Sequence, residues 1–135
     1  MIQLKLKEPF DLVFVNLNLV SPGTGATRTI DAKIDTGATV TVVPSYMVDG
    51  LGLEVMETRI LTTADGSPMQ VYVCPCIISF TDEDMFEMPI YVSTSKVAMA
   101  FVGMDILKHC NYVQWHDWKE GKHTIHFDLE LLDTI

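Results

Sequence analysis

Positive charge is scarce in this sequence of 135 residues. Nine Lys and Arg residues stand against eighteen Asp and Glu residues, which gives a formal net charge of −9 at pH 7. Binding of nucleic acid needs a basic face because the phosphate backbone is negatively charged. Nucleic acid is therefore not an expected partner, and the excess of acid is explained most simply as a well-hydrated surface.

Long hydrophobic runs are also missing. No apolar stretch reaches the ~18–20 residues that a membrane-spanning helix needs. The first residues, Met1–Lys7, alternate apolar and polar side chains, which is typical of a strand and not of the continuous apolar core of a signal peptide. We therefore expect no membrane partner and a cytoplasmic location. With 48% hydrophobic residues, the chain should fold as a single domain over residues 1–135.

Cysteine is rare, and its number is odd. The three residues are Cys74, Cys76 and Cys110, and an odd count argues against a disulfide framework. Cys74 and Cys76 would share one face of a strand, where they pair badly, and Cys-Pro-Cys is not a usual zinc spacing. His123 and His126 would fall on opposite faces of a strand. We expect buried free thiols and no metal site.

Short runs of Val, Ile, Leu and Thr make up most of the chain, and turn signals separate them. This spacing predicts an all-β protein, a small closed barrel or sandwich. Short helices are expected at Ser45–Leu51 and Met104–Cys110, and a late hairpin at Tyr112–His116 with Lys122–Phe127. Turn signals recur at Ser21–Gly23, Ala64–Pro68, Thr81–Asp84, Ser93–Lys96 and Lys119–Gly121.

The most informative segment reads Asp35-Thr36-Gly37-Ala38. A strand-like run, Arg28–Ile34, precedes it, and a second β-branched run, Thr39–Val43, follows it. The sequence thus places a carboxylate on a tight turn between two strands, with Gly37 free to adopt unusual backbone angles. From Asp35-Thr36-Gly37 alone, a plain turn in which the Asp side chain caps its own backbone is the favoured interpretation.

Three later segments extend the pattern, and the first of them is a short helix or turn at Pro44–Leu53. A hairpin is expected at Arg59–Cys74, with its tip at Ala64–Pro68, and the apolar run Phe101–Leu107 leads through Gly103 toward a short helix. In this order, and with this spacing, the segments resemble the retropepsin-like aspartic proteases, the single-lobed peptidases of retroviruses and retroelements. The resemblance covers residues 32 to 107. It implies an all-β barrel with one or two short helices and one lobe per chain.

The resemblance also implies a function. Peptide hydrolysis by this chemistry needs two carboxylates that share a proton, and the chain has a single Asp-Thr-Gly, because Asp133-Thr134-Ile135 lacks the Gly. The expected enzyme is therefore an aspartic endopeptidase, active as a homodimer, with Asp35 of each chain acting on a peptide or protein substrate. Neither a cofactor nor a metal is implied.

Roles for the neighbouring residues follow from the same resemblance. Thr36 would bond across the dimer axis, Gly37 would donate its N–H to the carboxylate, and Ala38 would complete the active-site loop. Gly103 would allow close packing under that loop, and Asp105 would brace the site. The tip residues of the flap, which would close over the substrate, are Ala64, Asp65, Gly66 and Ser67.

Two alternatives stay open at this stage. The first is a non-catalytic domain of the same fold that serves dimerisation or peptide binding, since a fold does not guarantee an activity. The second is an unrelated β-barrel binding module in which Asp35 only caps a turn.

Overall fold

The computed structural model describes residues 2–5, 14–80, 85–95, 99–117 and 124–131. Two one-turn helices lie in these ranges, α1 (Ser45–Val48) and α2 (Met104–Leu107). The strands of the same ranges are β1 (Ile2–Lys5), β2 (Phe14–Val20), β3 (Thr27–Ile34), β4 (Val42–Pro44), β5 (Glu57–Thr62), β6 (Pro68–Ser79), β7 (Met85–Ser93), β8 (Ala100–Val102), β9 (Cys110–Asp117) and β10 (Thr124–Leu131).

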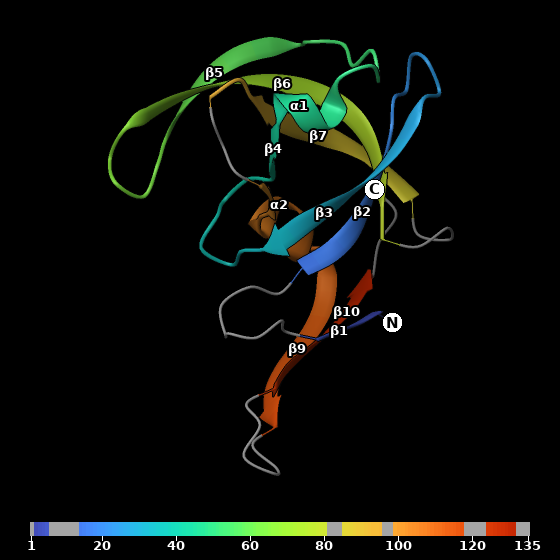
Figure 1. Cartoon of the computed structure of the whole chain (residues 1–135), viewed down its shortest axis with the longest axis vertical. Helices are drawn as coiled ribbons and strands as arrows, with labels where there is room; N and C mark the ends of the chain where they lie inside the picture. The colour runs from blue at the N-terminus through green and yellow to red at the C-terminus, as the bar shows by residue number, and fades with distance from the viewer. Residues whose placement is uncertain (1, 6–13, 81–84, 96–98, 118–123, 132–135) are drawn as a thin grey trace.

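The larger sheet closes into a barrel (Figure 1). Its strand order is β2-β3-β8-β4-β7-β6-β5, and β2 also pairs with β6, so six strands form a ring and β5 lies outside it. A smaller sheet has the order β1-β10-β9, and its β9–β10 hairpin extends away from the barrel. The prediction of an all-β barrel with short helices is confirmed.

The barrel closes because its strands alternate buried and outward-facing residues. In β2, Val15, Leu17 and Leu19 are buried, and in β3 the same alternation buries Ile30, Ala32 and Ile34. These side chains join one apolar core, and residues between them face outward. Removal of such side chains from water is the main force that holds the barrel together.

Both helices are shorter than predicted. The first was expected at Ser45–Leu51 but ends at Val48, and Gly50 follows with a φ of +84°, which takes the chain out of the helix. The second was expected at Met104–Cys110 but ends at Leu107, because Cys110 begins β9 and pairs with Leu131. Strand pairing between distant segments overrides the local preference for helix here.

Two hairpins lie where the sequence placed them. The first consists of β5 and β6, and its second strand continues beyond the predicted end to Ser79. The second consists of β9 and β10, which are antiparallel. Their first pair joins Asp117 to Thr124, and their last pair joins Cys110 to Leu131. The predicted N-terminal strand is β1, and it pairs with β10. Predicted turns at 81–84 and 119–121, with Lys122 and His123, lie outside the described residues.

Two prolines face each other inside the β6–β7 ladder. Pro75 of β6 is the register partner of Pro89 of β7. Proline has no N–H for a ladder hydrogen bond and is tolerated only where a strand lacks a second partner. Pro75 meets this condition, because β6 pairs with β5 up to Val73 and with β2 from Ile77 onward.

The three cysteines are free and buried, as predicted. Burial raises the pKa of the Cys74 thiol and raises the pKa of both the Cys76 and Cys110 thiols to about 11. Reactive cysteines need a thiolate, so these three are inert packing residues at neutral pH. In the described part of the chain, neither helix is long and apolar enough to cross a membrane.

Candidate active site

Asp35 begins the loop between β3 and β4. The Asp35 N–H donates to the carbonyl oxygen of Val102 (3.0 Å), which fixes the start of the loop against β8. The Gly37 N–H donates to Oδ1 of Asp35 (2.9 Å), and the Ala38 N–H donates to the Asp35 carbonyl oxygen (3.2 Å). Asp35 is half-buried, whereas Thr36 and Gly37 are exposed. The sequence suggested either a turn in which Asp35 caps its own backbone or the active-site loop of a protease. The hydrogen bonds of this loop fit both descriptions.

Gly103 lies directly beneath this loop. A Cβ at this position would lie 2.5 Å from the carbonyl oxygen of Val40 and 3.0 Å from that of Ala38, so only glycine fits. The residues after it bond to the same loop: the Met104 N–H donates to the Ala38 carbonyl (2.8 Å) and the Asp105 N–H to the Thr39 carbonyl (3.2 Å). The first turn of α2 therefore holds the loop by its backbone.

Asp105 and Thr41 add a side-chain brace behind the loop. The hydroxyl of Thr41, which is fully buried, donates to Oδ1 of Asp105 (2.7 Å), and the Thr41 N–H donates to Oδ2 (2.9 Å). The Gly103 N–H donates to the Thr41 hydroxyl oxygen (3.1 Å). Both carboxylate oxygens of Asp105 thus accept hydrogen bonds from Thr41. Asp105 does not line the groove described below. Sequence reasoning missed Thr41, which stood unremarked in a β-branched run.

The tip of the β5–β6 hairpin is a second tightly bonded turn. Oδ1 of Asp65 accepts hydrogen bonds from the Thr63 hydroxyl and from the Ser67 N–H (2.9 Å). The Gly66 N–H donates to the Thr63 carbonyl (2.9 Å), and Gly66 has a φ of +85°. The Thr63 hydroxyl, followed by the Ser67 bonds, lowers the pKa of Asp65 to about 2. The tip is exposed, yet its own polar groups shape it.

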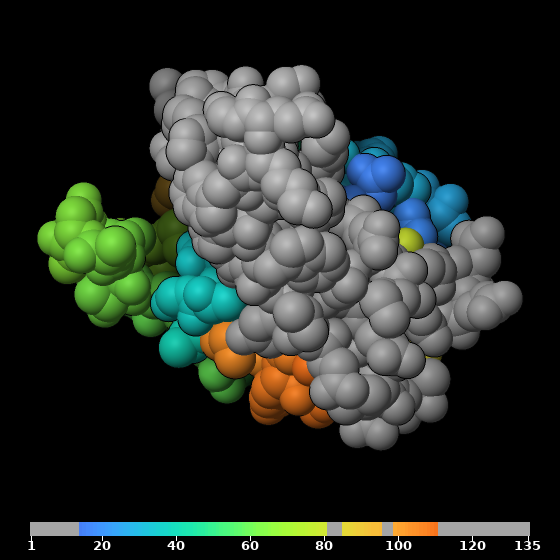
Figure 2. All heavy atoms as spheres, turned by 90° about the horizontal axis from the view of Figure 1, so that it is seen from below, coloured from blue at the N-terminus to red at the C-terminus, as the bar shows by residue number. Residues whose placement is uncertain are grey.

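A groove of about 560 Å³ separates this tip from the Asp35 loop. In Figure 2 the green tip stands out from the body of the protein, beside the cyan atoms of the loop. Of the predicted site residues, Asp35, Gly37, Ala38 and Ala64 line the groove. Its other lining residues, which the sequence did not single out, are Thr39, Val40, Val42, Leu61, Thr62, Thr63, Met69 and Phe101.

The groove is mostly apolar, and Asp35 supplies the one carboxylate among its described lining residues. Val40, Leu61, Met69 and Phe101 pack against a small buried cluster that continues under the hairpin. Within the described ranges, no three His, Cys, Asp or Glu side chains gather closely enough to hold a metal ion.

Comparisons with known proteins give the family and the fold of this chain. Residues 23–109 match the family described as gag-polyprotein putative aspartyl protease. The chain belongs to this family. No curated protein sequence matches this chain.

Solved structures give the fold of this chain. A retropepsin-like aspartic protease from Rickettsia conorii aligns with a TM-score of 0.61 and 14% identity, over 95% of this chain and 92% of that chain. EIAV protease, solved in complex with the inhibitor HBY-793, aligns with a TM-score of 0.57 and 13% identity, over 76% of this chain and 91% of that chain. The chain therefore has the retropepsin-like fold.

Proposed function

We propose that residues 1–135 form one aspartic endopeptidase unit that is active as a homodimer. The observation that carries the proposal is the single groove carboxylate, Asp35, fixed on its loop by the Gly37 N–H. Hydrolysis by this chemistry needs a second carboxylate close to the first. A twofold axis beside the loop supplies it, because each residue near the axis then meets its own copy.

In this dimer the two Asp35 carboxyl groups share one proton, since two negative charges so close together are unfavourable. The ionised group takes a proton from water, which attacks the scissile carbonyl carbon. The protonated group donates to the carbonyl oxygen. The exposed Thr36 would bond across the axis, and Ala38 lines the groove beside the reacting groups.

The β5–β6 hairpin serves as the flap in this proposal. Its groove-lining residues include Leu61, Ala64 and Met69, so an extended peptide in the groove would touch both the flap and the Asp35 loop. Backbone groups of the tip would pair with the peptide as a neighbouring strand does. Closure of the flap would exclude water from the reacting bond.

Asp35→Asn tests the catalytic assignment. An amide cannot act as the general base, so cleavage of unfolded protein should fall by about 10³-fold or more. Binding of a statine-containing peptide, measured by calorimetry, should persist. Asp49→Asn makes the same chemical change at an exposed position at the end of α1 and should keep full activity. Turnover in the Asp35→Asn protein that equals the wild type would contradict the proposal.

Dilution tests the shared site. A monomer carries one carboxylate, so specific activity should fall as the dimer dissociates. Activity and sedimentation are measured over the same concentration series. Constant activity in a protein that sediments as a monomer would refute the dyad. Peptide binding by a dimer that never cleaves would favour the non-catalytic alternative.

A further inference from the structure

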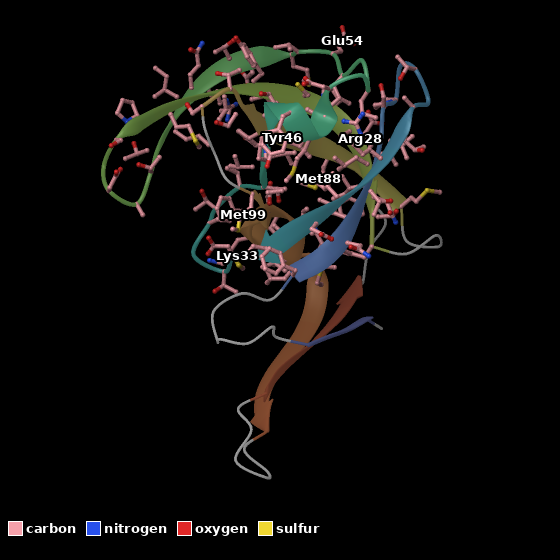
Figure 3. All side chains as sticks on the ribbon, in the orientation of Figure 1. Arg28, Lys33, Tyr46, Glu54, Met88 and Met99 are labelled. Carbon is pink, nitrogen blue, oxygen red and sulfur yellow. The ribbon has the colours of Figure 1, made fainter. Side chains whose placement is uncertain are left out.

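Lys33 is a cation on the same face of β3 as the catalytic-loop carboxylate. Ala32 and Ile34 point into the core, so Lys33 and Asp35 lie on the opposite, outward face together with Asp31. Figure 3 labels Lys33 at the end of β3 from which the Asp35 loop departs. The strand therefore brings an ammonium group to the neighbourhood of the groove.

Phe101 connects Lys33 to the groove. Phe101 of β8 is the register partner of Lys33 in the parallel β3–β8 pair, and its side chain lines the groove. The Lys33 Nζ lies 5.9 Å from the centroid of the Phe101 ring. Lys33 is not itself a lining residue of the groove, and its ammonium group lies against the ring of one residue that is. Phe14 of β2 is the register partner on the other side of Lys33.

The ammonium group has no carboxylate partner within the described residues. The one side-chain ion pair of those residues joins Arg59 to Glu57, although Asp31 and Asp35 share the face of Lys33. An ammonium group has three N–H donors, and the contact with an aromatic face leaves donors free for an acceptor. Lys33 is half-buried as a residue, and long cationic side chains bury the stem while the charged end stays available to an incoming carboxylate.

We propose that Lys33 determines specificity by binding an acidic side chain, Asp or Glu, of the peptide substrate. The inference rests on the proposed peptidase function and names one feature of its substrates. In a twofold dimer each protomer contributes one Lys33. The acidic preference should therefore occur at two positions, one on each side of the scissile bond and equally distant from it.

A binding experiment tests this preference independently of turnover. Statine-containing peptides carry Glu, Gln or Lys at each position in turn, and calorimetry gives the Kd of each. At one symmetric pair of positions, Glu should bind about fivefold more tightly than Gln, the upper range for a solvent-accessible ion pair. High salt should reduce this ratio because it screens the charges.

Variants of Lys33 show whether this residue is responsible. Lys33→Gln should abolish the difference between Glu and Gln, and Lys33→Glu should reverse it in favour of Lys at the same positions. Lys108→Gln removes one charge from an exposed residue at the end of α2 and should leave the preference intact. A structural role alone would not produce the reversal.

The outcomes separate this inference from the proposed function. Equal binding of Glu and Gln at every position, or a preference that survives Lys33→Gln, would overturn the role of Lys33 while leaving the peptidase proposal untouched. An acidic preference in a dimer that cleaves no peptide would support Lys33 and count against the peptidase. If none of the peptides binds, both proposals fail.

Discussion

Asp35 and Asp65 occupy two turns with the same local chemistry. In both, Oδ1 accepts a hydrogen bond at 2.9 Å from the N–H two residues later, Gly37 in the first turn and Ser67 in the second. Both turns join strands, and both carry one glycine. The local sequence therefore builds the same carboxylate-capped turn on the two sides of the groove.

The surroundings of the two turns differ. The Asp35 loop rests on Gly103 and on the bonded pair of Thr41 and Asp105. The Asp65 turn is exposed and depends on its own groups, among them the Thr63 hydroxyl. In the proposed peptidase, the carboxylate that meets substrate at a fixed position would need support from distant residues, whereas the turn that covers substrate would need only its own shape.

Gly103→Ala removes support from the Asp35 loop and leaves the Asp65 turn untouched, and it should have the largest effect on stability. The new Cβ would collide with the carbonyl groups of Val40 and Ala38, so stability should fall by about 3 kcal/mol, the upper part of the range for overpacking. Denaturant unfolding measures the change. Gly23→Ala is the matched control, because nothing lies within 4 Å of the place that its new methyl group would occupy, and it should stay within about 0.5 kcal/mol of wild type. Equal stability of the two variants would show that the loop adapts.

Thr41→Val should have an intermediate effect. It removes the acceptor for the Gly103 N–H and one donor to Asp105 without a large change of volume, at a cost of about 1–3 kcal/mol. Cleavage should slow further than stability alone explains, because the Asp35 loop loses its brace. Thr41→Ser keeps the hydroxyl and should recover most of the loss in kcat. If Val and Ser perform alike, the hydroxyl is not the bracing group.

Asp65→Asn should have the smallest effect, and it should depend on pH. The pKa of Asp65 in the folded turn is lowered to about 2 from an ordinary value of 3.8. The contribution of the ionised Asp65 to the stability of the fold is therefore present above about pH 4 and is lost as pH falls through about 2. The amide signals of Thr63 and Gly66, followed by NMR, should shift in this window in wild type and not in Asp65→Asn. A shift that persists in the variant would have to come from another group.

The sequence predicted those features that depend on neighbouring residues. The Asp35 loop and the hairpin tip at Ala64–Pro68 follow from Asp, Gly and Pro at set spacings, and such signals act over a few residues. The alternation that predicted a strand at Arg28–Ile34 is equally local, and the structure has β3 there. Even the free, buried state of the cysteines followed from their number and spacing.

Features that depend on distant residues escaped the sequence analysis. Thr41 lies 64 positions from Asp105, and neither residue alone indicates the other. The groove walls at Leu61, Met69 and Phe101 are ordinary apolar strand residues until the fold brings them together. The helix expected at Met104–Cys110 was too long for the same reason, since the partner of Cys110 is Leu131.

The facing prolines of β6 and β7 mark how far the strands of the β5–β6 hairpin can separate. The rung between Pro75 and Pro89 lies between the part of β6 that pairs with β5 and the part that pairs with β2, so the ladder beyond it is held separately. On the tip side β6 pairs with β5, and on the far side with β2. Separation of strands that begins at the hairpin tip should therefore end near Pro75. Such an opening would admit a bulky polypeptide to the groove while the strands of the barrel stay paired.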